Sequence, residues 1–202
     1  IFKKQNIIKN SNFFIIPGSG IETKRYYKLK TPKKDNFTFL VVARLITHKG
    51  ILEYYEAAKK IKSKFDKFNF ILVGDYDSKD RYSIDSNLYK KIINNNIIKY
   101  ISASDKIENL ILASDCVILP SYREGMSKSL LEAAYLKKPL LASNVPGCKE
   151  IVINGKNGYL FKKQNANDLA SKMLQISQID KRKLKSFGNY SNIHVKQNFT
   201  SK

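Results

Sequence analysis

Two glutamates, Glu124 and Glu132, stand eight residues apart in the stretch PSYREGMSKSLLEAA, directly after an apolar run at 115–119. A single helix holding both carboxylates would place them roughly 80° apart, because successive helical residues are separated by about 100°. Gly125, next to the first glutamate, would let the chain bend there. The pattern predicts Glu124 in a loop, Glu132 in the second turn of a helix, and free backbone amides between them. Such a segment could bind sugar hydroxyls through its carboxylates and an anion through its amides.

The same stretch also has an interpretation that involves no ligand. Ser129 and Glu132 have the spacing of a helix capping box, and Glu124 could be a solvated acid in a turn. Tyr122 and Arg123, just before Glu124, could contact a sugar or could lie on the surface. The residues of this segment alone leave these alternatives open.

Two cations follow another apolar run, at 37–43, in the segment ARLITHKG. Arg44 and Lys49 are five residues apart across a turn that leads into an amphipathic helix, so both could face a ligand at the start of that helix. The planar fork of an arginine together with the point charge of a lysine suits a diphosphate. Cations beside turns are usually only solvated, so this pair indicates a phosphate site chiefly in combination with the two glutamates.

Other chemistries lack the residues that they require. Cys116 and Cys148 are too few and too widely spaced for a Cys-x-x-Cys site or a disulfide framework. His48 and His194 do not have a zinc-binding spacing, and no Gly-x-Ser-x-Gly sequence presents a serine nucleophile. Zinc hydrolases and triad hydrolases are therefore excluded, and we expect neither a metal site nor a cofactor.

Short apolar runs alternate along the chain with segments of helical periodicity. The runs lie at 13–16, 37–43, 69–73, 97–101, 115–119, 139–142 and 158–161. The helical segments lie at 49–65, 85–95, 106–113, 127–137 and 167–177. In the first helix one buried face would be formed by Ile51, Tyr54, Ala58, Ile61 and Phe65. This alternation predicts an α/β fold with a doubly wound, mostly parallel, Rossmann-like sheet and helices on both faces, which binds ligands at the carboxyl ends of its strands.

The length of 202 residues corresponds to a single domain. We expect an opening strand and a basic linker at 1–34, the main sheet at 35–180 and a C-terminal helical tail at 181–202. Most of the formal net charge of +20 comes from the two ends, because 1–34 carry nine Lys or Arg and one acid, while 181–202 carry six and none. Only five of the 37 basic residues are Arg, which nucleic-acid surfaces favour, so we expect no specific nucleic-acid partner.

Taken together, these segments resemble the C-terminal, nucleotide-sugar-binding domain of the GT-B fold retaining glycosyltransferases of family 4, the group 1 transferases. VARLITHKG is similar to the family's strand, arginine, turn and Lys-Gly element. The segment from DCVILPSYREGMSKSLLEAA to GKNGYLF is similar to its signature of two glutamates separated by seven residues, and IIPGSGIE resembles the strand that opens the domain. The second of these segments is most similar to transferases that build bacterial surface glycans such as capsule and lipopolysaccharide.

The resemblance implies a role for each of these residues. Arg44 and Lys49 would neutralise the donor diphosphate, Glu132 would bind the ribose, and Glu124 would bind the donor sugar; Arg44, Lys49 and Glu124 are the catalytic candidates. The donor-binding set is completed by Gly125, by backbone amides of Met126, Ser127, Lys128 and Ser129, and by the base-reading backbone between Ser102 and Asp105. Transfer would retain the anomeric configuration without a protein nucleophile, from a donor that we expect to be UDP-linked.

The resemblance also implies partners and a location. The acceptor, a glycan or a lipid-linked glycan, would bind mainly to the family's N-terminal domain, which we take to be absent here, so the isolated chain is expected to bind donor without turnover. We expect a cytoplasmic protein, with peripheral contact to the anionic inner face of the membrane. Two alternatives are a metal-dependent transferase that uses Asp75 and Asp77 as an Asp-x-Asp motif, and a non-enzymatic basic module that binds membranes or nucleic acid.

Overall fold

The computed structural model describes residues 21, 36–102 and 106–200. The expected strand at 13–16 and almost all of the expected linker lie outside these residues. The strands are β1 (Phe37–Val42), β2 (Phe68–Val73), β3 (Lys99–Ile101), β4 (Cys116–Leu119), β5 (Leu140–Ser143) and β6 (Gly158–Phe161). The helices are the 3₁₀ helix η2 (Thr47–Lys49), α1 (Ile51–Lys62), α2 (Ser86–Ile93), α3 (Ile107–Ala113), α4 (Lys128–Tyr135), α5 (Pro146–Lys149), α6 (Ala166–Ser177) and α7 (Lys181–Asn198).

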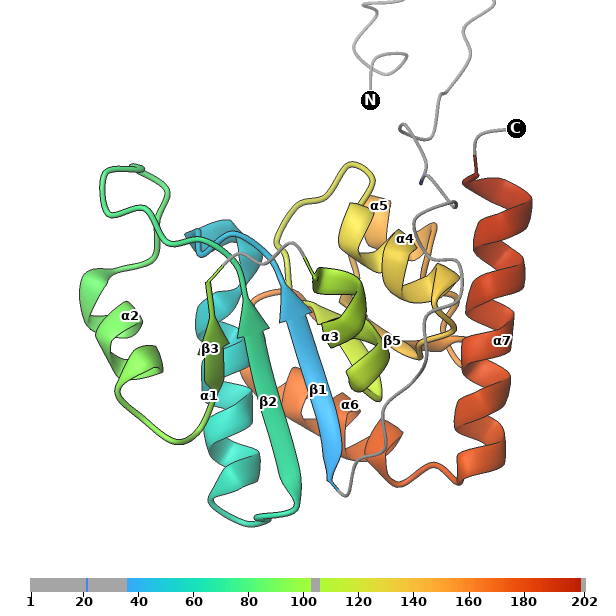
Figure 1. Ribbon diagram of the computed structural model, residues 1–202, viewed down its shortest axis with the longest axis horizontal. Helices are drawn as coiled ribbons and strands as arrows, with labels where there is room; N and C mark the ends of the chain where they lie inside the picture. The colour runs from blue at the N-terminus through green and yellow to red at the C-terminus, as the bar shows by residue number, and fades with distance from the viewer. Residues whose placement is uncertain (1–20, 22–35, 103–105, 201–202) are drawn as a thin grey trace, which may run out of the picture.

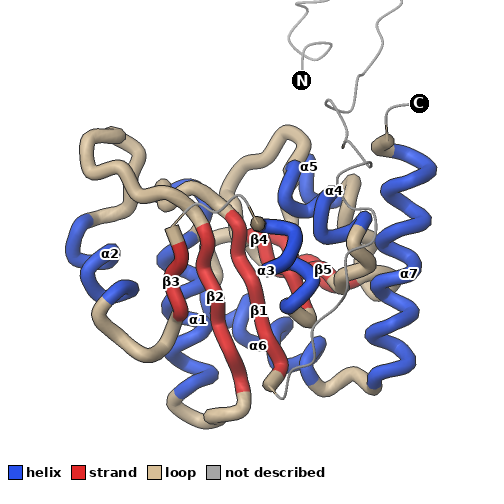
Figure 2. The backbone as a smooth tube through the Cα atoms, viewed as in Figure 1, coloured by secondary structure: helices blue, strands red, loops and turns tan. Residues whose placement is uncertain are grey.

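The six strands form one sheet in the order β3-β2-β1-β4-β5-β6, and all described pairs are parallel (Figures 1 and 2). The chain first builds outward from β1 through β2 to β3, and then continues on the other side of β1 with β4, β5 and β6. The direction of winding therefore changes between β1 and β4. In sheets of this kind, ligands bind outside the carboxyl ends of the strands at such a switch point.

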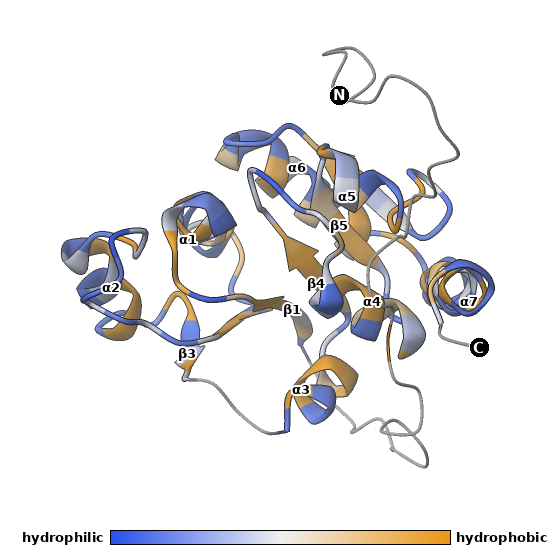
Figure 3. Ribbon diagram, turned by 90° about the horizontal axis from the view of Figure 1, so that it is seen from above, coloured by the Kyte–Doolittle hydropathy of each residue, from blue (hydrophilic) through white to orange (hydrophobic). Residues whose placement is uncertain are grey.

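Helices cover both faces of the sheet, because buried parallel strands are apolar on both sides. In β1, Phe39 and Val41 pack into one core cluster with residues of α1, α2 and α6, whereas Leu40 packs into a second cluster with residues of α3, α4, α5 and α7. Figure 3 shows α1 and α6 on one side of the sheet and α3 and α4 on the other. The prediction of a doubly wound α/β fold is confirmed.

Helix α1 starts directly after Gly50, whose φ of +69° places it in the left-handed region, where glycine is favoured. Ile51, Tyr54, Ala58 and Ile61 are buried against the sheet, as the periodicity predicts. The helix ends at Lys62, so Phe65 lies beyond it and is 39% exposed. The expectation that Phe65 extends this buried face is wrong, because the helical period stops one turn earlier.

Helix α7 packs along α4 (Figure 1). The Ser191 hydroxyl donates a hydrogen bond to the carbonyl of Lys138 at 3.0 Å. Gly188 lies so close to the Lys137 carbonyl that a Cβ there would be 2.1 Å from its oxygen. Within the described part of the chain, no helix is long and apolar enough to cross a membrane.

Candidate functional site

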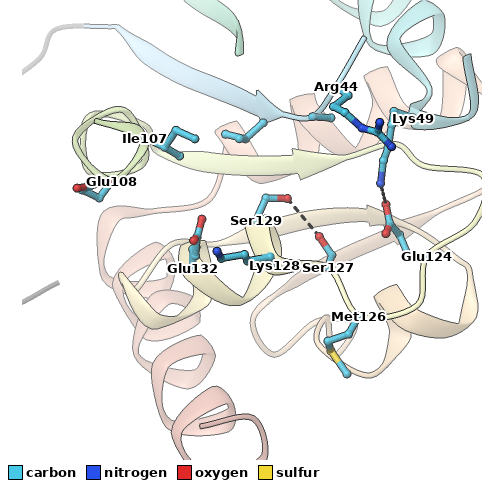
Figure 4. A pocket seen from close by; sticks show the side chains of 12 residues that line it. Arg44, Lys49, Ile107, Glu108, Glu124, Met126, Ser127, Lys128, Ser129 and Glu132 are labelled. Atoms are coloured by element: carbon cyan, nitrogen blue, oxygen red, sulfur yellow. Dashed lines mark hydrogen bonds and ion pairs between the residues drawn. The ribbon is translucent and has the colours of Figure 1, made fainter. Parts of the chain in front are cut away.

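A cavity of about 570 Å³ lies at the switch point, between the carboxyl ends of β1 and β4 (Figure 4). Its walls come from the end of β1 and the turn after it, from the first turn of α3, and from the loop and helix after β4. The lining residues are Val42, Ala43, Arg44, Lys49, Ile107, Glu108, Glu124, Met126, Ser127, Lys128, Ser129 and Glu132. Eight of them belong to the site predicted from the sequence, so the fold brings together two segments that are about 80 residues apart.

The turn after β1 supplies the cationic wall of the cavity. Arg44 is exposed, and its guanidinium makes no hydrogen bond or ion pair with another described residue. Lys49 ends the short helix η2, and the left-handed Gly50 directs the chain from there into α1. Figure 4 shows the Arg44 and Lys49 side chains side by side at the same wall. An anion in the cavity would therefore meet one guanidinium that has no protein partner among these residues.

The opposite wall is the start of α4. The Ser127 hydroxyl caps this helix by accepting a hydrogen bond from the Leu130 amide at 3.3 Å, and it lies 3.2 Å from the Ser129 hydroxyl. The capping-box interpretation of Ser129 and Glu132 is therefore wrong, because the cap lies two residues earlier. The amides of Lys128 and Ser129, in the first turn, have no helical partner, and they carry the positive end of the helix dipole.

Glu132 lies in the second turn of α4, as the sequence predicts, and it lines the cavity although its residue surface is only 9% exposed. No hydrogen bond or ion pair joins its carboxylate to another described residue. The carboxylate oxygens are not among the buried polar atoms of the described chain, so they are accessible from the cavity and can accept hydrogen bonds from water or a ligand. This position suits a ligand with hydroxyl groups.

Lys49 and Glu124 form an ion pair across the cavity. The Lys49 Nζ atom donates to Glu124 Oε1 at 2.5 Å, and the two side chains are 22% and 9% exposed (Figure 4). Glu124 is thus not the solvated turn acid of the alternative interpretation. The pair joins the loop after β4 to the turn after β1, and each partner reduces the charge that the other presents to a ligand.

Around the loop after β4, the glycine that close packing requires is Gly147 and not Gly125. Gly125 does not have a left-handed φ, and a Cβ there would meet no described atom within 4 Å, so the expectation that the bend requires glycine at this position is wrong. Gly147, in α5, is the residue that requires glycine, because its Cβ would lie 1.7 Å from the Gly125 carbonyl oxygen. Nearby, burial and then the charge of Glu124 raise the pKa of the Cys148 thiol to about 12.

Tyr122 does not line the cavity, and its hydroxyl contacts another side chain of the protein. Its hydroxyl donates to the carboxylate of Glu53 on α1, 2.7 Å from Oε1 and 2.8 Å from Oε2. Burial, followed by the hydrogen bond and charge of Glu53, raises the pKa of the Tyr122 hydroxyl far above its usual value, so this group remains a donor at neutral pH. Glu53 is a residue that the sequence reasoning missed, since its position in the first helical turn is equally typical of a solvated acid.

The remaining predicted residues lie outside the cavity or outside the described chain. Ser102 is exposed just after β3 and does not line the cavity, and Asp105 is not among the described residues. Met126 lines the cavity, but its side chain points away from the Lys49–Glu124 pair (Figure 4). Ile107 and Glu108 of α3 line the cavity without having been predicted, because no local pattern shows that α3 faces this site.

The Asp-x-Asp alternative has no support from the cavity. Asp75 and Asp77 lie in the loop after β2, and neither lines the cavity. The side chain of Asp77 instead accepts a hydrogen bond from the Lys79 amide at 2.8 Å within that loop. Across the residues with described positions, no group of three or more His, Cys, Asp or Glu side chains could hold a metal ion.

Comparison with known proteins is consistent with this geometry. The family model described as glycosyl transferases group 1 matches residues 22–193. An N,N'-diacetylbacillosaminyl-diphospho-undecaprenol alpha-1,3-N-acetylgalactosaminyltransferase from Campylobacter jejuni is 31% identical over 189 residues, which is 88% of this chain and 48% of that protein. A UDP-Gal:alpha-D-GlcNAc-diphosphoundecaprenol alpha-1,3-galactosyltransferase from Escherichia coli is 30% identical over 151 residues, 72% of this chain and 38% of that protein.

Among solved structures, HepE from Anabaena in complex with UDP and glucose has a similar fold. The TM-score is 0.72 at 24% sequence identity, over 82% of this chain and 45% of that one. The chain therefore spans less than half the length of these relatives.

Proposed function

Because the chain belongs to the group 1 glycosyltransferases, we propose that it is the donor-binding lobe of a retaining enzyme that transfers a hexose-type sugar from a UDP-sugar to a lipid-linked glycan. The family match covers most of the chain and confirms the resemblance seen in the sequence. One structural observation carries the proposal. A guanidinium without a partner among the described residues, free helix amides and a carboxylate accessible from the cavity surround a single cavity at the switch point of the sheet.

The donor diphosphate would lie between the two walls of the cavity. Arg44 and Lys49 supply positive charge from one side, and the first amides of α4 supply hydrogen-bond donors from the other. The Arg44 guanidinium and the α4 amides are in place before a ligand arrives, whereas Lys49 must first exchange its Glu124 partner for the negative charge that develops on the leaving diphosphate.

The rest of the donor would contact the two glutamates and the loop after β3. Glu132 would accept hydrogen bonds from the ribose hydroxyls, and Glu124 from hydroxyls of the donor sugar, next to the amides of Met126 and Ser127. The backbone from Ser102 to Asp105 would read the base. Ser102 directly follows β3, whose carboxyl end lies at the same edge of the sheet as the cavity.

In the transfer step, the bond between the anomeric carbon and the diphosphate oxygen breaks, and its electron pair goes to the diphosphate. The acceptor hydroxyl oxygen forms the new glycosidic bond on the same face of the sugar, and its proton passes to the departing phosphate oxygen. Glu124 would position the sugar, while Arg44 and Lys49 would hold the leaving group. No protein nucleophile takes part in this route.

The donor and acceptor classes rest on the relatives. One relative at 30% identity is named for UDP-Gal, and both named relatives act on diphospho-undecaprenol-linked sugars. A lipid-linked acceptor would bring the enzyme to the inner face of the cytoplasmic membrane. Since this chain spans less than half of those proteins, donor binding is the property to test on it, and turnover would need the acceptor-binding part.

Calorimetric titration of the chain with UDP, GDP and ADP tests the proposal. We expect UDP to bind, and Arg44→Ala and Glu132→Ala each to weaken binding about tenfold, the scale of one charge-assisted hydrogen bond, with unchanged thermal unfolding. Matched controls are Arg182→Ala on α7 and Glu56→Ala on α1, two exposed residues outside the cavity. Absence of binding to all three nucleotides by the folded protein would refute the donor-site assignment.

A further inference from the structure

We infer that Tyr122, held by Glu53, is a positioning residue that keeps the loop carrying Glu124 in register with the diphosphate-binding turn when the donor separates Lys49 from Glu124. The inference deepens the proposed function and rests on it. It concerns Glu53, which the sequence pattern does not single out, and Tyr122, for which the sequence left open contact with a sugar or a place on the surface.

Four contacts join the segment 48–53 to the segment 120–124. The Tyr122 amide donates to the His48 carbonyl at 2.8 Å, and Gly50 packs against Pro120, whose carbonyl oxygen would lie 2.0 Å from a Cβ at Gly50. The other two contacts are the ion pair of Lys49 with Glu124 and the hydrogen bond of Tyr122 to Glu53. These contacts connect the end of the turn after β1 and the first turn of α1 to the first part of the loop after β4.

The Lys49–Glu124 contact is the one that a donor would disturb. The diphosphate would take the Lys49 ammonium as a partner, and the sugar hydroxyls would take the Glu124 carboxylate. Once that ion pair opens, the remaining three contacts must hold Glu124 at the distance that the sugar requires. Two of those three involve Tyr122, which is only two residues before Glu124.

The Tyr122–Glu53 bond is suited to this task because it does not depend on the ligand. Glu53 is 9% exposed and lies in the first turn of α1, anchored by the buried face of that helix. The hydroxyl lies within 2.8 Å of both carboxylate oxygens, which is a charge-assisted contact of short length. Neither residue lines the cavity, so a donor bound there would not compete for this hydrogen bond.

A positioning role makes a specific prediction about two ligands. UDP contacts the diphosphate site but has no sugar for Glu124, whereas a UDP-sugar uses both. Loss of the tyrosine hydroxyl should therefore reduce the affinity for the UDP-sugar more than the affinity for UDP. A purely structural role would lower the stability of the fold and leave the ratio of the two affinities unchanged.

The experiment is calorimetric titration of the chain and its Tyr122→Phe variant with UDP and with UDP-glucose, UDP-galactose, UDP-N-acetylglucosamine and UDP-N-acetylgalactosamine. The sugar nucleotide that wild type binds most tightly is used for the comparison. In Tyr122→Phe the ratio of its affinity to the affinity for UDP should be about tenfold lower than in wild type, while the affinity for UDP itself changes by no more than about twofold. Tyr54→Phe is the matched control, because Tyr54 also lies on α1 and its hydroxyl donates to the carbonyls of Phe39 and Ile71, away from Glu124. It should lower the melting temperature without changing the ratio.

Glu53 provides a second test that does not require the Tyr122 variant to fold. Glu53→Gln keeps an acceptor for the Tyr122 hydroxyl, so the ratio of UDP-sugar affinity to UDP affinity should stay close to that of wild type. In Glu53→Ala this ratio should fall about as far as in Tyr122→Phe. The double variant Tyr122→Phe, Glu53→Ala should show the same ratio as Glu53→Ala, because both substitutions remove the same hydrogen bond. An unchanged ratio in Tyr122→Phe or in Glu53→Ala, with wild type binding both ligands, overturns the positioning role alone. Wild type that binds neither UDP nor any sugar nucleotide overturns the proposed function, and this inference with it.

Discussion

Replacement of Glu124 by glutamine should make the protein bind UDP more tightly, although Glu124 belongs to the proposed site. In the free protein the Glu124 carboxylate lies 2.5 Å from the Lys49 ammonium, so a diphosphate has to compete with it for that cation. UDP has no sugar hydroxyls that could donate to Glu124 in place of Lys49. The substitution keeps the size of the side chain and removes the competing charge.

The size of the effect follows from the geometry of the ion pair. A phosphate oxygen bound to the other side of the Lys49 ammonium would lie roughly 5 Å from Glu124, a separation at which two unit charges repel by about 0.8 kcal/mol in water and about 3 kcal/mol at an effective dielectric constant near 20. Lys49 is 22% exposed, so part of this repulsion is screened by solvent. We expect the lower part of the range, about 1 kcal/mol, or roughly a fivefold increase in UDP affinity.

Calorimetric titration with UDP at low and high salt measures this effect. The gain should shrink as salt is added, because the repulsion is electrostatic. Glu56→Gln changes the net charge by the same amount at an exposed position of α1 outside the cavity, and it should leave UDP affinity unchanged. If Glu124→Gln instead weakened UDP as strongly as Lys49→Ala does, Glu124 would be holding Lys49 in place for the diphosphate, and the competition argument would be refuted.

Two further predictions concern the packing of α5 against the loop that carries Glu124, and the dependence of the free energy of unfolding on pH. Gly147→Ala should weaken UDP-sugar binding and lower the free energy of unfolding by about 1 to 3 kcal/mol, because the new Cβ would lie 1.7 Å from the Gly125 carbonyl oxygen. Urea titration measures the stability and calorimetry measures the binding. Wild-type stability together with wild-type affinity would contradict the packing argument. The pKa of the Cys148 thiol is raised from 9.0 to about 12, chiefly by burial, so the unfolded chain releases this proton first as the pH rises. The free energy of unfolding should therefore fall from about pH 9 toward pH 12, and less steeply in Cys148→Ala; parallel curves for the two proteins would contradict this.

Most strands and helices could be predicted from local pattern alone, since a continuous apolar run between polar turns has few alternatives to a buried strand. Two of the boundary errors occur where a side chain accepts hydrogen bonds from backbone amides. The run at 97–101 yields a strand only from Lys99, because the Asn95 side chain accepts hydrogen bonds from the amides of Ile97 and Ile98. Helix α4 starts after the Ser127 cap and is shorter at both ends than the pattern at 127–137 suggests.

The lining of the cavity was predictable to the extent that its residues follow strand ends. Arg44, Lys49 and Glu132 could be chosen from their positions after apolar runs, because parallel strands bring their carboxyl ends to one edge. Glu108 could not be chosen in this way, since its inclusion depends on how α3 packs across the sheet. The role of Gly125 was misassigned because a glycine in a turn signals a possible bend, whereas the observed constraint lies at Gly147 in another element.

The sequence by itself determined the alternation of strands and helices, the family, and the residue types offered at the ends of β1 and β4. The elements depend on neighbours within a few positions along the chain, and the family on the order of its motifs along most of the chain. Only the tertiary structure decided that Lys49 meets Glu124 and that Tyr122 meets Glu53, because these pairs are separated by 75 and 69 residues. Which side chains meet across such separations is set by strand order and by the approach of backbones such as Gly50 to Pro120, and neither is encoded in local periodicity.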